Sequence, residues 1–343
     1  MQRRQLLRST ALSTLASALP LTMAFAQNAI QPAAGTREVL LLVEKSSHCL
    51  SYYDIASGER IHTIPLAQFP HEFVVDAARR FAYVGHYGVE TSGHLGQGGT
   101  RIFQIDIAAH TLARTIDIAP FNRLHGVQMD QSGRLYVLSE DRAQLAIIDH
   151  PETDTAPRRA TAVGGIKSHL FALSRDGETA YAMNLLSHTV TKFKPHDPTF
   201  VPVPCSPGDK PEGNALSADE RTLYITCRWS NTLCAIDTES MKVVRRAASR
   251  NDATRLYLFR DGRLVVSNYG ERSLSVVDPV TLRELAHIPM EARAIALSYH
   301  PTRPLAFVSQ DNDKVGIFNM ESLRFERFIA TQREPDVSQL VLL

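Results

Sequence analysis

Short runs of alternating hydrophobic and polar residues recur along most of this chain, separated by polar turns. Clear examples read GRLYVLSEDRAQLAIID, RTLYITCRWSNTLCAID and GRLVVSNYGERSLSVVD. Each is a β-rich run, a turn and a second β-rich run that ends in Asp. Because alternation with a period of two is typical of half-buried strands, the sequence predicts many short antiparallel β-strands.

Each of these hairpins belongs to a larger repeat. A further short strand precedes it, as in HGVQMDQSGR and EGNALSADER, and a fourth strand follows it, as in MKVVRRAAS and LRELAHIPM. Units of four strands and about 40 to 45 residues indicate the blades of a β-propeller. Six complete units begin near the following residues: His71, His125, His169, Glu212, Thr254 and Arg293.

The two ends of the repeat region supply a seventh blade. Residues 39–66 provide three strands without a first one, and residues 338–342 provide a strand with no hairpin after it. We expect these segments to pair, because closure of the ring covers edge strands that would otherwise promote aggregation. The prediction is an all-β, seven-bladed β-propeller, formed as a single domain by residues 27–343 and closed by N- and C-terminal strands.

A recurring dipeptide gives the repeat a resemblance to a known family. Tyr83-Val84, Tyr136-Val137 and Tyr224-Ile225 each precede a turn and a strand that ends in Asp. This pattern resembles the YVTN-type bacterial propeller repeats and covers nearly all of the chain after residue 26. The resemblance implies the propeller architecture. It leaves the chemistry open, because that family includes binding proteins as well as lactonase-like and lyase-like members.

Residues 1–26 have the features of an export signal. Arg3 and Arg4 precede a run of small and apolar residues, and Ala24-Phe25-Ala26 forms a small-x-small cleavage site before Gln27. The paired arginines resemble a twin-arginine signal, which exports proteins already folded. Because the apolar run is too interrupted for a stable membrane span, we expect a periplasmic protein without integral membrane insertion.

Composition and missing motifs exclude several functional classes. The 343 residues carry a net charge of +1, with 44% hydrophobic and 21% charged residues, as in a soluble globular protein. Without a clustered basic excess, no nucleic-acid partner is expected. The chain has no CxxCH for haem c, no GxGxxG for NAD and no GxSxG nucleophile elbow, and its single Trp argues against pyrroloquinoline quinone (PQQ).

Two of the four cysteines flank a short turn. Cys227 and Cys234 lie on either side of residues 228–232 and could face each other across a hairpin. An oxidising compartment permits a disulfide between them, but two buried thiols fit the sequence equally well.

The repeat alignment brings together residues that no local motif connects. The first strand of each blade lines the channel of a propeller, so the first residues of these strands lie at one level. Three successive blades place a histidine there and the fourth a carboxylate, with Asp336 predicted at the same level in the closing blade. Imidazole and carboxylate ligands suit Zn, Fe, Mn or Cu. The predicted metal ligands are His71, His125, His169 and Glu212, and the three histidines are also the predicted catalytic residues.

Two other interpretations of the histidines remain open. Polar groups and water commonly fill propeller channels, so the histidines could serve only as channel lining. They could also act directly as acid and base, without a metal.

The blade that begins near His71 has an insertion that should emerge beside the histidines. Residues 86–100 include five glycines and the side chains of His86 and His94. The segment could be a lid or an extra ligand arm, and it could equally be a mobile loop. Other predicted substrate contacts on this face are Arg228, Trp229 and Arg293, of which the arginines suit an anionic ligand.

Two functions therefore fit the sequence. The first is a metal-dependent hydrolase or lyase that acts on a small polar or anionic substrate in the channel. The second is a non-catalytic propeller that binds a metal, a small ligand or a periplasmic protein partner.

Overall fold

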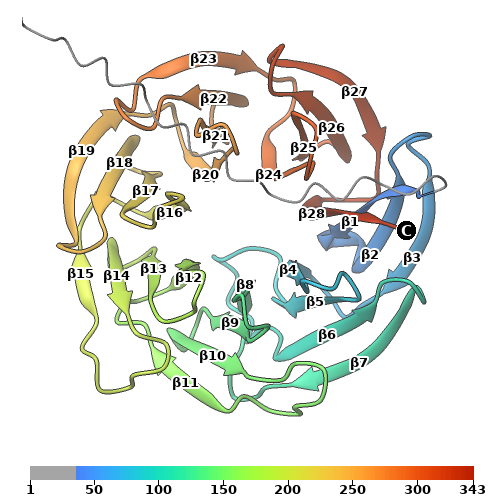
Figure 1. Ribbon diagram of the computed structural model, residues 1–343, viewed down its shortest axis with the longest axis horizontal. Helices are drawn as coiled ribbons and strands as arrows, with labels where there is room; N and C mark the ends of the chain where they lie inside the picture. Colours follow the sequence, from blue (N-terminus) through green and yellow to red (C-terminus); the bar gives the residue numbers. More distant parts are fainter. Residues whose placement is uncertain (1–35) are drawn as a thin grey trace, which may run out of the picture.

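The computed structural model describes residues 36–343 and confirms the seven-bladed, all-β propeller (Figure 1). Seven four-stranded antiparallel sheets lie side by side around a central channel. The predicted export signal, residues 1–26, lies outside the described residues. None of the helical structure within residues 36–343 is long and apolar enough to cross a membrane.

In each of the first six blades the strands follow one another in sequence order from the channel outward. Blade 1 contains β4 (Pro70–Val75), β5 (Phe81–His86), β6 (Arg101–Asp106) and β7 (Thr111–Asp117). Blade 2 contains β8 (Leu124–Met129), β9 (Leu135–Ser139), β10 (Gln144–Ile148) and β11 (Arg159–Ala162). Blade 3 contains β12 (Ser168–Leu173), β13 (Ala180–Asn184), β14 (Thr189–Phe193) and β15 (Val203–Cys205).

The next three blades repeat this order. Blade 4 contains β16 (Pro211–Leu216), β17 (Thr222–Cys227), β18 (Thr232–Asp237) and β19 (Lys242–Ala248). Blade 5 contains β20 (Ala253–Leu258), β21 (Leu264–Asn268), β22 (Ser273–Val277) and β23 (Glu284–Pro289). Blade 6 contains β24 (Ala294–Tyr299), β25 (Leu305–Gln310), β26 (Lys314–Asn319) and β27 (Arg324–Ala330).

Blade 7 joins the two ends of the described chain, as the sequence predicted. It contains β28 (Pro335–Leu342), β1 (Glu38–Glu44), β2 (Cys49–Asp54) and β3 (Arg60–Pro65), with a short 3-10 turn η1 (Lys45–Ser47) after β1. The strand β28 pairs antiparallel with β1, with Leu340 opposite Leu40. The ring is therefore closed by hydrogen bonds between segments from opposite ends of the sequence.

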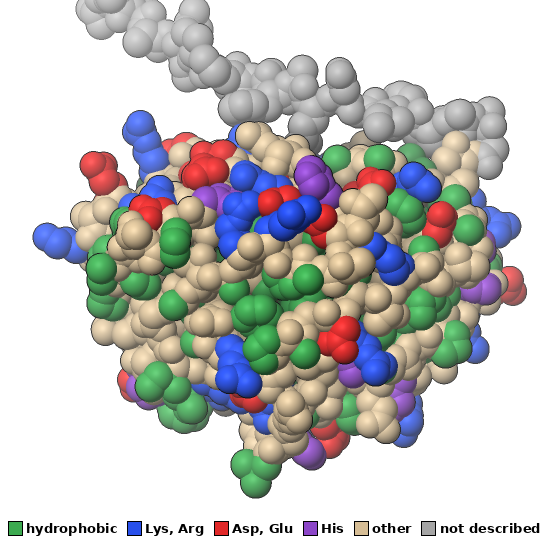
Figure 2. Space-filling view, turned by 90° about the horizontal axis from the view of Figure 1, so that it is seen from below, with side chains coloured by type: hydrophobic (Ala, Val, Ile, Leu, Met, Phe, Trp, Pro, Cys, Tyr) green, Lys and Arg blue, Asp and Glu red, His purple; other side chains and the backbone are tan. Residues whose placement is uncertain are grey.

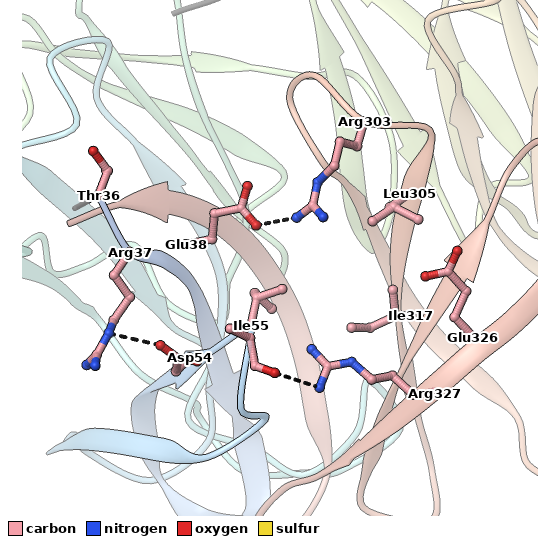
Figure 3. A pocket seen from close by; sticks show the side chains of 11 residues that line it. Thr36, Arg37, Glu38, Asp54, Ile55, Arg303, Leu305, Ile317, Glu326 and Arg327 are labelled. Carbon is pink, nitrogen blue, oxygen red and sulfur yellow. Dashed lines mark hydrogen bonds and ion pairs between the residues drawn. The ribbon is translucent and has the colours of Figure 1, made fainter. Parts of the chain in front are cut away.

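Side chains also cross the junction between blades 6 and 7. Arg303 of blade 6 pairs with Glu38, and Arg327 donates to the backbone oxygen of Ala56 at 3.3 Å (Figure 3). These contacts border a cavity of about 580 Å³ beside the junction. Blades 6 and 7 are thus linked by polar contacts as well as by their shared core.

The hydrophobic core lies between the blades. Each of seven clusters of buried apolar side chains is shared by two neighbouring blades, so every blade packs against both of its neighbours. Hydrophobic, basic and acidic side chains are interspersed over the side of the ring seen in Figure 2. Packing between blades, rather than a single central core, therefore stabilises the molecule.

A β-bulge interrupts the innermost strand of every blade near its start. In blade 1, residues 71 and 72 both lie opposite Gly85, because the register shifts between Pro70 and Phe73. Similar shifts occur where the innermost strand pairs in the other six blades. A bulge leaves a residue outside the ladder and redirects its side chain. The bulge residues of five blades contact one another around the channel, and they are His71, His125, His169, Glu212 and Asp336.

Candidate metal centre in the channel

The three histidines predicted from the repeat alignment lie against one another in the structure. The ring of His125 on β8 lies 4.3 Å from that of His71 on β4 and 3.8 Å from that of His169 on β12, measured between ring centroids. All three are buried, and His125 has no exposed surface. Tyr87, which follows β5, packs its ring edge-on against all three.

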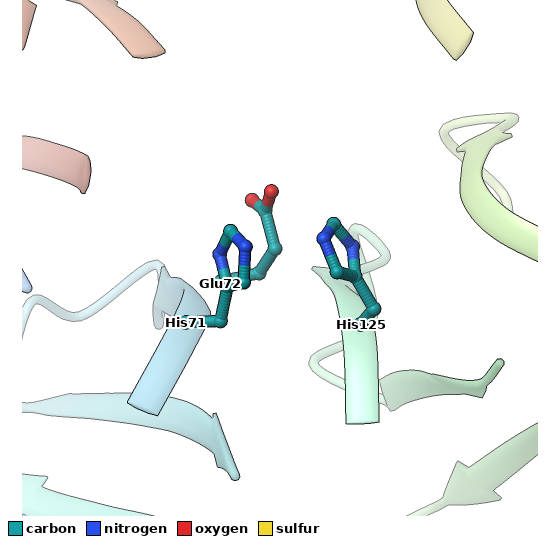
Figure 4. A group of neighbouring side chains, drawn as sticks. All are labelled: His71, Glu72 and His125. Carbon is teal, nitrogen blue, oxygen red and sulfur yellow. The ribbon is translucent and has the colours of Figure 1, made fainter. Parts of the chain in front are cut away.

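The tightest group of potential ligand atoms comes from His71, Glu72 and His125 (Figure 4). One atom from each of these side chains lies within 4.8 Å of the other two. Glu72 was not among the predicted ligands, because strict alternation would point its side chain away from the channel. The bulge at residues 71 and 72 brings both side chains to the same side.

The chemistry of these side chains fits a transition metal. Both ring nitrogens of His125 are buried and have no hydrogen-bond partner among the described residues. Burial, together with the neighbouring His169 and His71, lowers the pKa of His125 well below its usual value. A neutral imidazole with an available lone pair is the form that ligates metals.

A buried carboxylate lies beside Nδ1 of His71. Asp336, on β28, lies 3.0 Å from Nδ1 of His71, at ion-pair distance but without a well-aligned hydrogen bond. Burial would raise the pKa of Asp336, but the charges of His71, Lys45 and Arg255 outweigh it and hold that pKa well below its ordinary range. A carboxylate behind a ligating histidine is a common arrangement at metal sites.

His169 belongs to a different network, centred on Glu140. Nδ1 of His169 lies 2.5 Å from Glu140, which also accepts from Lys167 at 2.6 Å and from the Tyr87 hydroxyl at 3.0 Å. Arg123 lies 3.4 Å from the same carboxylate. Burial would raise the pKa of Glu140, but His169 and Lys167 lower it to about 2. The ionised Glu140 thus fixes the ring of His169 by its Nδ1.

Two further ion pairs complete the lining of the channel. Arg255 lies 3.1 Å from Glu72, and Arg228 lies 2.8 Å from Glu212. Nε2 of His169 is 3.9 Å from Glu212, so this predicted ligand lies nearer to His169 than to the tight group. Burial would raise the pKa of Glu212, but Arg228 and His169 lower it. Glu212 therefore remains ionised at neutral pH.

Glu72 is the most exposed member of the group formed by His71, Glu72 and His125. The side chain of Glu72 is 15% exposed, whereas that of His71 is 8% exposed. Tyr87 is 1% exposed and covers the histidines on the side of the 86–100 loop.

The 86–100 loop is fixed to the body of the protein. Arg123 is buried and donates to the backbone oxygens of Ser92, His94 and Gly96. Gly98 has a φ of +79°, and a Cβ there would lie 2.4 Å from the side chain of Arg123. Of the two loop histidines predicted as substrate contacts, His94 is exposed and His86 packs against Phe103. The structure places Tyr87, rather than either loop histidine, against the histidine cluster.

The other predicted substrate contacts lie at varied distances from the cluster. Arg228 is next to it, paired with Glu212 and with Asp252. Trp229 is 62% exposed, with the Lys210 ammonium 5.0 Å from its ring. Arg293 pairs with Asp311. The sequence alignment also selected Thr254, but the adjacent Arg255 is the residue of β20 that contacts Glu72.

The cysteines are buried free thiols in the structure. Cys227 pairs with Thr232 in the hairpin, and Cys234 pairs with Ile225. The two cysteines are thus diagonal neighbours rather than directly opposed. The sequence allowed either a disulfide or two buried thiols, and the structure has two buried thiols.

Fold and site together define a seven-bladed β-propeller with a cluster of histidines and carboxylates in its channel. No family model matches the chain, and no curated protein matches its sequence.

Solved structures with the same fold include proteins of different function. The periplasmic gluconolactonase PpgL of Pseudomonas aeruginosa is 19% identical, with a TM-score of 0.69 over 89% of this chain and 99% of that one. The dihydro-heme d1 dehydrogenase NirN is 12% identical, with a TM-score of 0.65 over 88% of this chain and 74% of that one. A functionally unknown protein from Desulfotomaculum acetoxidans is 13% identical, with a TM-score of 0.70 over 89% of this chain and 98% of that one. At these identities the likeness concerns the fold.

Proposed function

We propose that this protein is a periplasmic, metal-dependent hydrolase that opens a small polar or anionic ester or lactone in its channel. The observation that supports this most directly is His125, a fully buried histidine beside His71 and Glu72. Neither of its ring nitrogens has a hydrogen-bond partner among residues 36–343. A buried polar group without a partner costs free energy, and a metal ion would satisfy it. We therefore assign the metal to His71, Glu72 and His125.

Residues around this group have separate roles in the proposed reaction. A bound Zn, Fe, Mn or Cu ion would polarise a carbonyl group and lower the pKa of a coordinated water. His169 is the proposed proton acceptor, because Glu140 holds its Nδ1 and leaves Nε2 directed toward Glu212. Arg255 contacts Glu72 and offers further N–H groups to an anionic substrate.

Lactones are the first substrate class to test. The gluconolactonase PpgL has the same fold, and hydrolysis of a lactone suits a carbonyl-polarising metal site. The resemblance of the repeats to a family with lactonase-like members points in the same direction.

The metal assignment predicts that His125→Ala abolishes metal binding. Wild-type protein, purified without a histidine tag, should contain one equivalent of a transition metal by elemental analysis. His125→Ala should retain less than about a tenth of it, because the removed ring supplies one of three ligands. His94→Ala is the matched control, since His94 is exposed on the nearby loop and should leave the metal content unchanged. Metal at full occupancy in His125→Ala would contradict the assignment.

The proposed role of His169 predicts a different outcome for His169→Gln. This variant should keep its metal and lose lactone hydrolysis by roughly 10²-fold or more, the usual contribution of a positioned acid or base. Loss of the metal in His169→Gln would instead make His169 a ligand, as the sequence alignment suggested.

The deep burial of the cluster favours a second candidate, a metal- or ligand-binding propeller without catalysis. Metal binding that depends on His125, combined with no turnover of a lactone and ester panel, would support this alternative.

A further inference from the structure

A further cavity lies between the outer three strands of blade 6 and the segment that joins blade 5 to blade 6. Its volume is about 210 Å³, and it is bordered by Met290, by residues at the turn between β25 and β26, and by two phenylalanines of β27. A cavity of about 150 Å³ holds benzene, so this one has room for a single ring with a polar substituent.

Blades 3 and 5 show what an amide at the end of the second strand usually does. In blade 5, Asn268 donates to the hydroxyls of Ser273 and Ser275 on β22, at 3.1 and 2.8 Å. In blade 3, Asn184 donates to the hydroxyls of two threonines on β14, at 3.2 and 3.1 Å. The strand registers place Gln310 at the same position in blade 6.

The amide of Gln310 has no hydroxyl acceptors at the corresponding positions of β26. The residues of β26 that correspond to the two hydroxyl residues are Lys314 and Gly316, and neither offers an oxygen from its side chain. Gln310 is 3% exposed, and its Nε2 has no hydrogen-bond partner within residues 36–343. Blade 6 therefore has a buried N–H donor that borders a cavity. In blades 3 and 5 the corresponding amide donates to two hydroxyl groups.

Gly316 lets an aromatic ring take the place of the missing side chain. A Cβ at this position would lie 2.5 Å from the ring of Phe325 and 2.9 Å from Nε2 of Gln310. The ring of Phe325 stacks on that of Phe328, with centroids 5.1 Å apart and planes at 26°. Phe328 is 51% exposed although it borders the cavity. The wall of the cavity is thus a pair of stacked rings that an aromatic ligand can extend.

Two donors at the cavity, the ammonium of Lys314 and the amide of Gln310, suit a carboxylate on such a ligand. Lys314 is exposed, borders the cavity and has no ion pair with any residue that the structure describes. With the amide of Gln310 it offers two donors to acceptor oxygens. Glu291 also borders the cavity and would accept an additional amino group.

We propose that this cavity is a second binding site, for a small aromatic carboxylate. The ligand ring stacks on Phe325 and Phe328. One carboxylate oxygen accepts from Nε2 of Gln310, and the carboxylate pairs with the ammonium of Lys314. This site is separate from the channel, and its existence does not depend on the proposed hydrolase activity.

Titration of the whole exported protein with benzoate, followed by calorimetry and saturation-transfer NMR, tests this proposal. Benzoate should bind saturably at one equivalent, and benzyl alcohol, which keeps the ring and lacks the carboxylate, should bind at least tenfold more weakly. Gln310→Leu should weaken benzoate binding at least tenfold, because it removes the donor and keeps a similar shape. Phe328→Ala should have a similar effect by removing half of the stacked wall.

Two controls keep the test decisive. Val244→Ala removes an apolar side chain of similar exposure from the outer strand of blade 4 and should leave the affinity unchanged. Because Phe328 is half exposed, its variant should fold even if Gln310→Leu does not. The proposal is wrong if benzoate does not saturate, if benzyl alcohol binds equally well, or if Phe328→Ala and a folded Gln310→Leu both bind as the wild type does.

Discussion

A chain that ends at Glu334 should fail to fold into a stable monomer. This truncation removes β28, which forms the innermost strand of blade 7 and pairs with β1. It also removes Leu340 and Val341, which belong to the two hydrophobic clusters on either side of blade 7. Blade 7 would then present an unpaired, apolar strand to the channel, and its contacts with blades 1 and 6 would be incomplete. Circular dichroism and size-exclusion chromatography should show aggregated or unfolded protein.

Two controls make this result interpretable. Removal of Leu343 alone deletes two backbone hydrogen bonds to Arg37 and should leave a cooperative thermal transition. A synthetic peptide of residues 335–343 should restore folding of the truncated chain, because it can add as a strand to the edge of β1. A truncated chain that melts cooperatively within a few degrees of the wild type would show that ring closure is dispensable.

Glu140→Ala should cost about 3–5 kcal/mol of unfolding free energy, the usual effect of removing one partner from a buried charge network. Glu140 is fully buried, and its loss would leave Lys167, Arg123 and the Tyr87 hydroxyl without their common acceptor. Urea unfolding at neutral pH measures the effect. Asp141→Ala is the matched control, because Asp141 contacts the same two basic residues from a position that is 35% exposed. It should cost about 0–1 kcal/mol.

The effect of Glu140 should also depend on pH. Its pKa falls from an ordinary value of 4.5 to about 2 on folding, so the ionised carboxylate stabilises the folded state fully above pH 4.5. That stabilisation is lost as the pH falls from 4.5 toward 2. The difference in stability between wild type and Glu140→Gln should therefore be largest near neutral pH and shrink over this window. A difference that does not change between pH 6 and pH 3 would contradict the ionised state of Glu140.

The repeat made the fold predictable from the sequence. Four-strand units and incomplete units at both ends were enough to predict seven blades closed by the terminal strands, as the structure shows. The same alignment brought His71, His125 and His169 together, because corresponding positions of propeller blades lie at one level of the channel.

Other parts of the candidate site could not be predicted in this way. Glu72 joins His71 because of a bulge, and alternating polarity does not reveal a bulge. Glu140 and Tyr87 reach the histidines from turns after second strands, where sequence spacing says little about side-chain direction. Arg255, rather than the aligned Thr254, contacts Glu72, and here the register of β20 shifts between Ala253 and Arg255. Bulges and turns thus account for what the repeat alignment missed.

Because of the bulges, the residues of the candidate site are different from the residues that form the hydrophobic core. Bulge residues such as His125 and Ile295 lie outside the regular ladder pairs of their strands, while the apolar clusters between blades form the core. Substitution of His71, His125 or His169 therefore changes the channel without removing a residue from the apolar clusters between blades. Because the innermost strand of every blade has a bulge, the side chains that face the channel can vary one blade at a time.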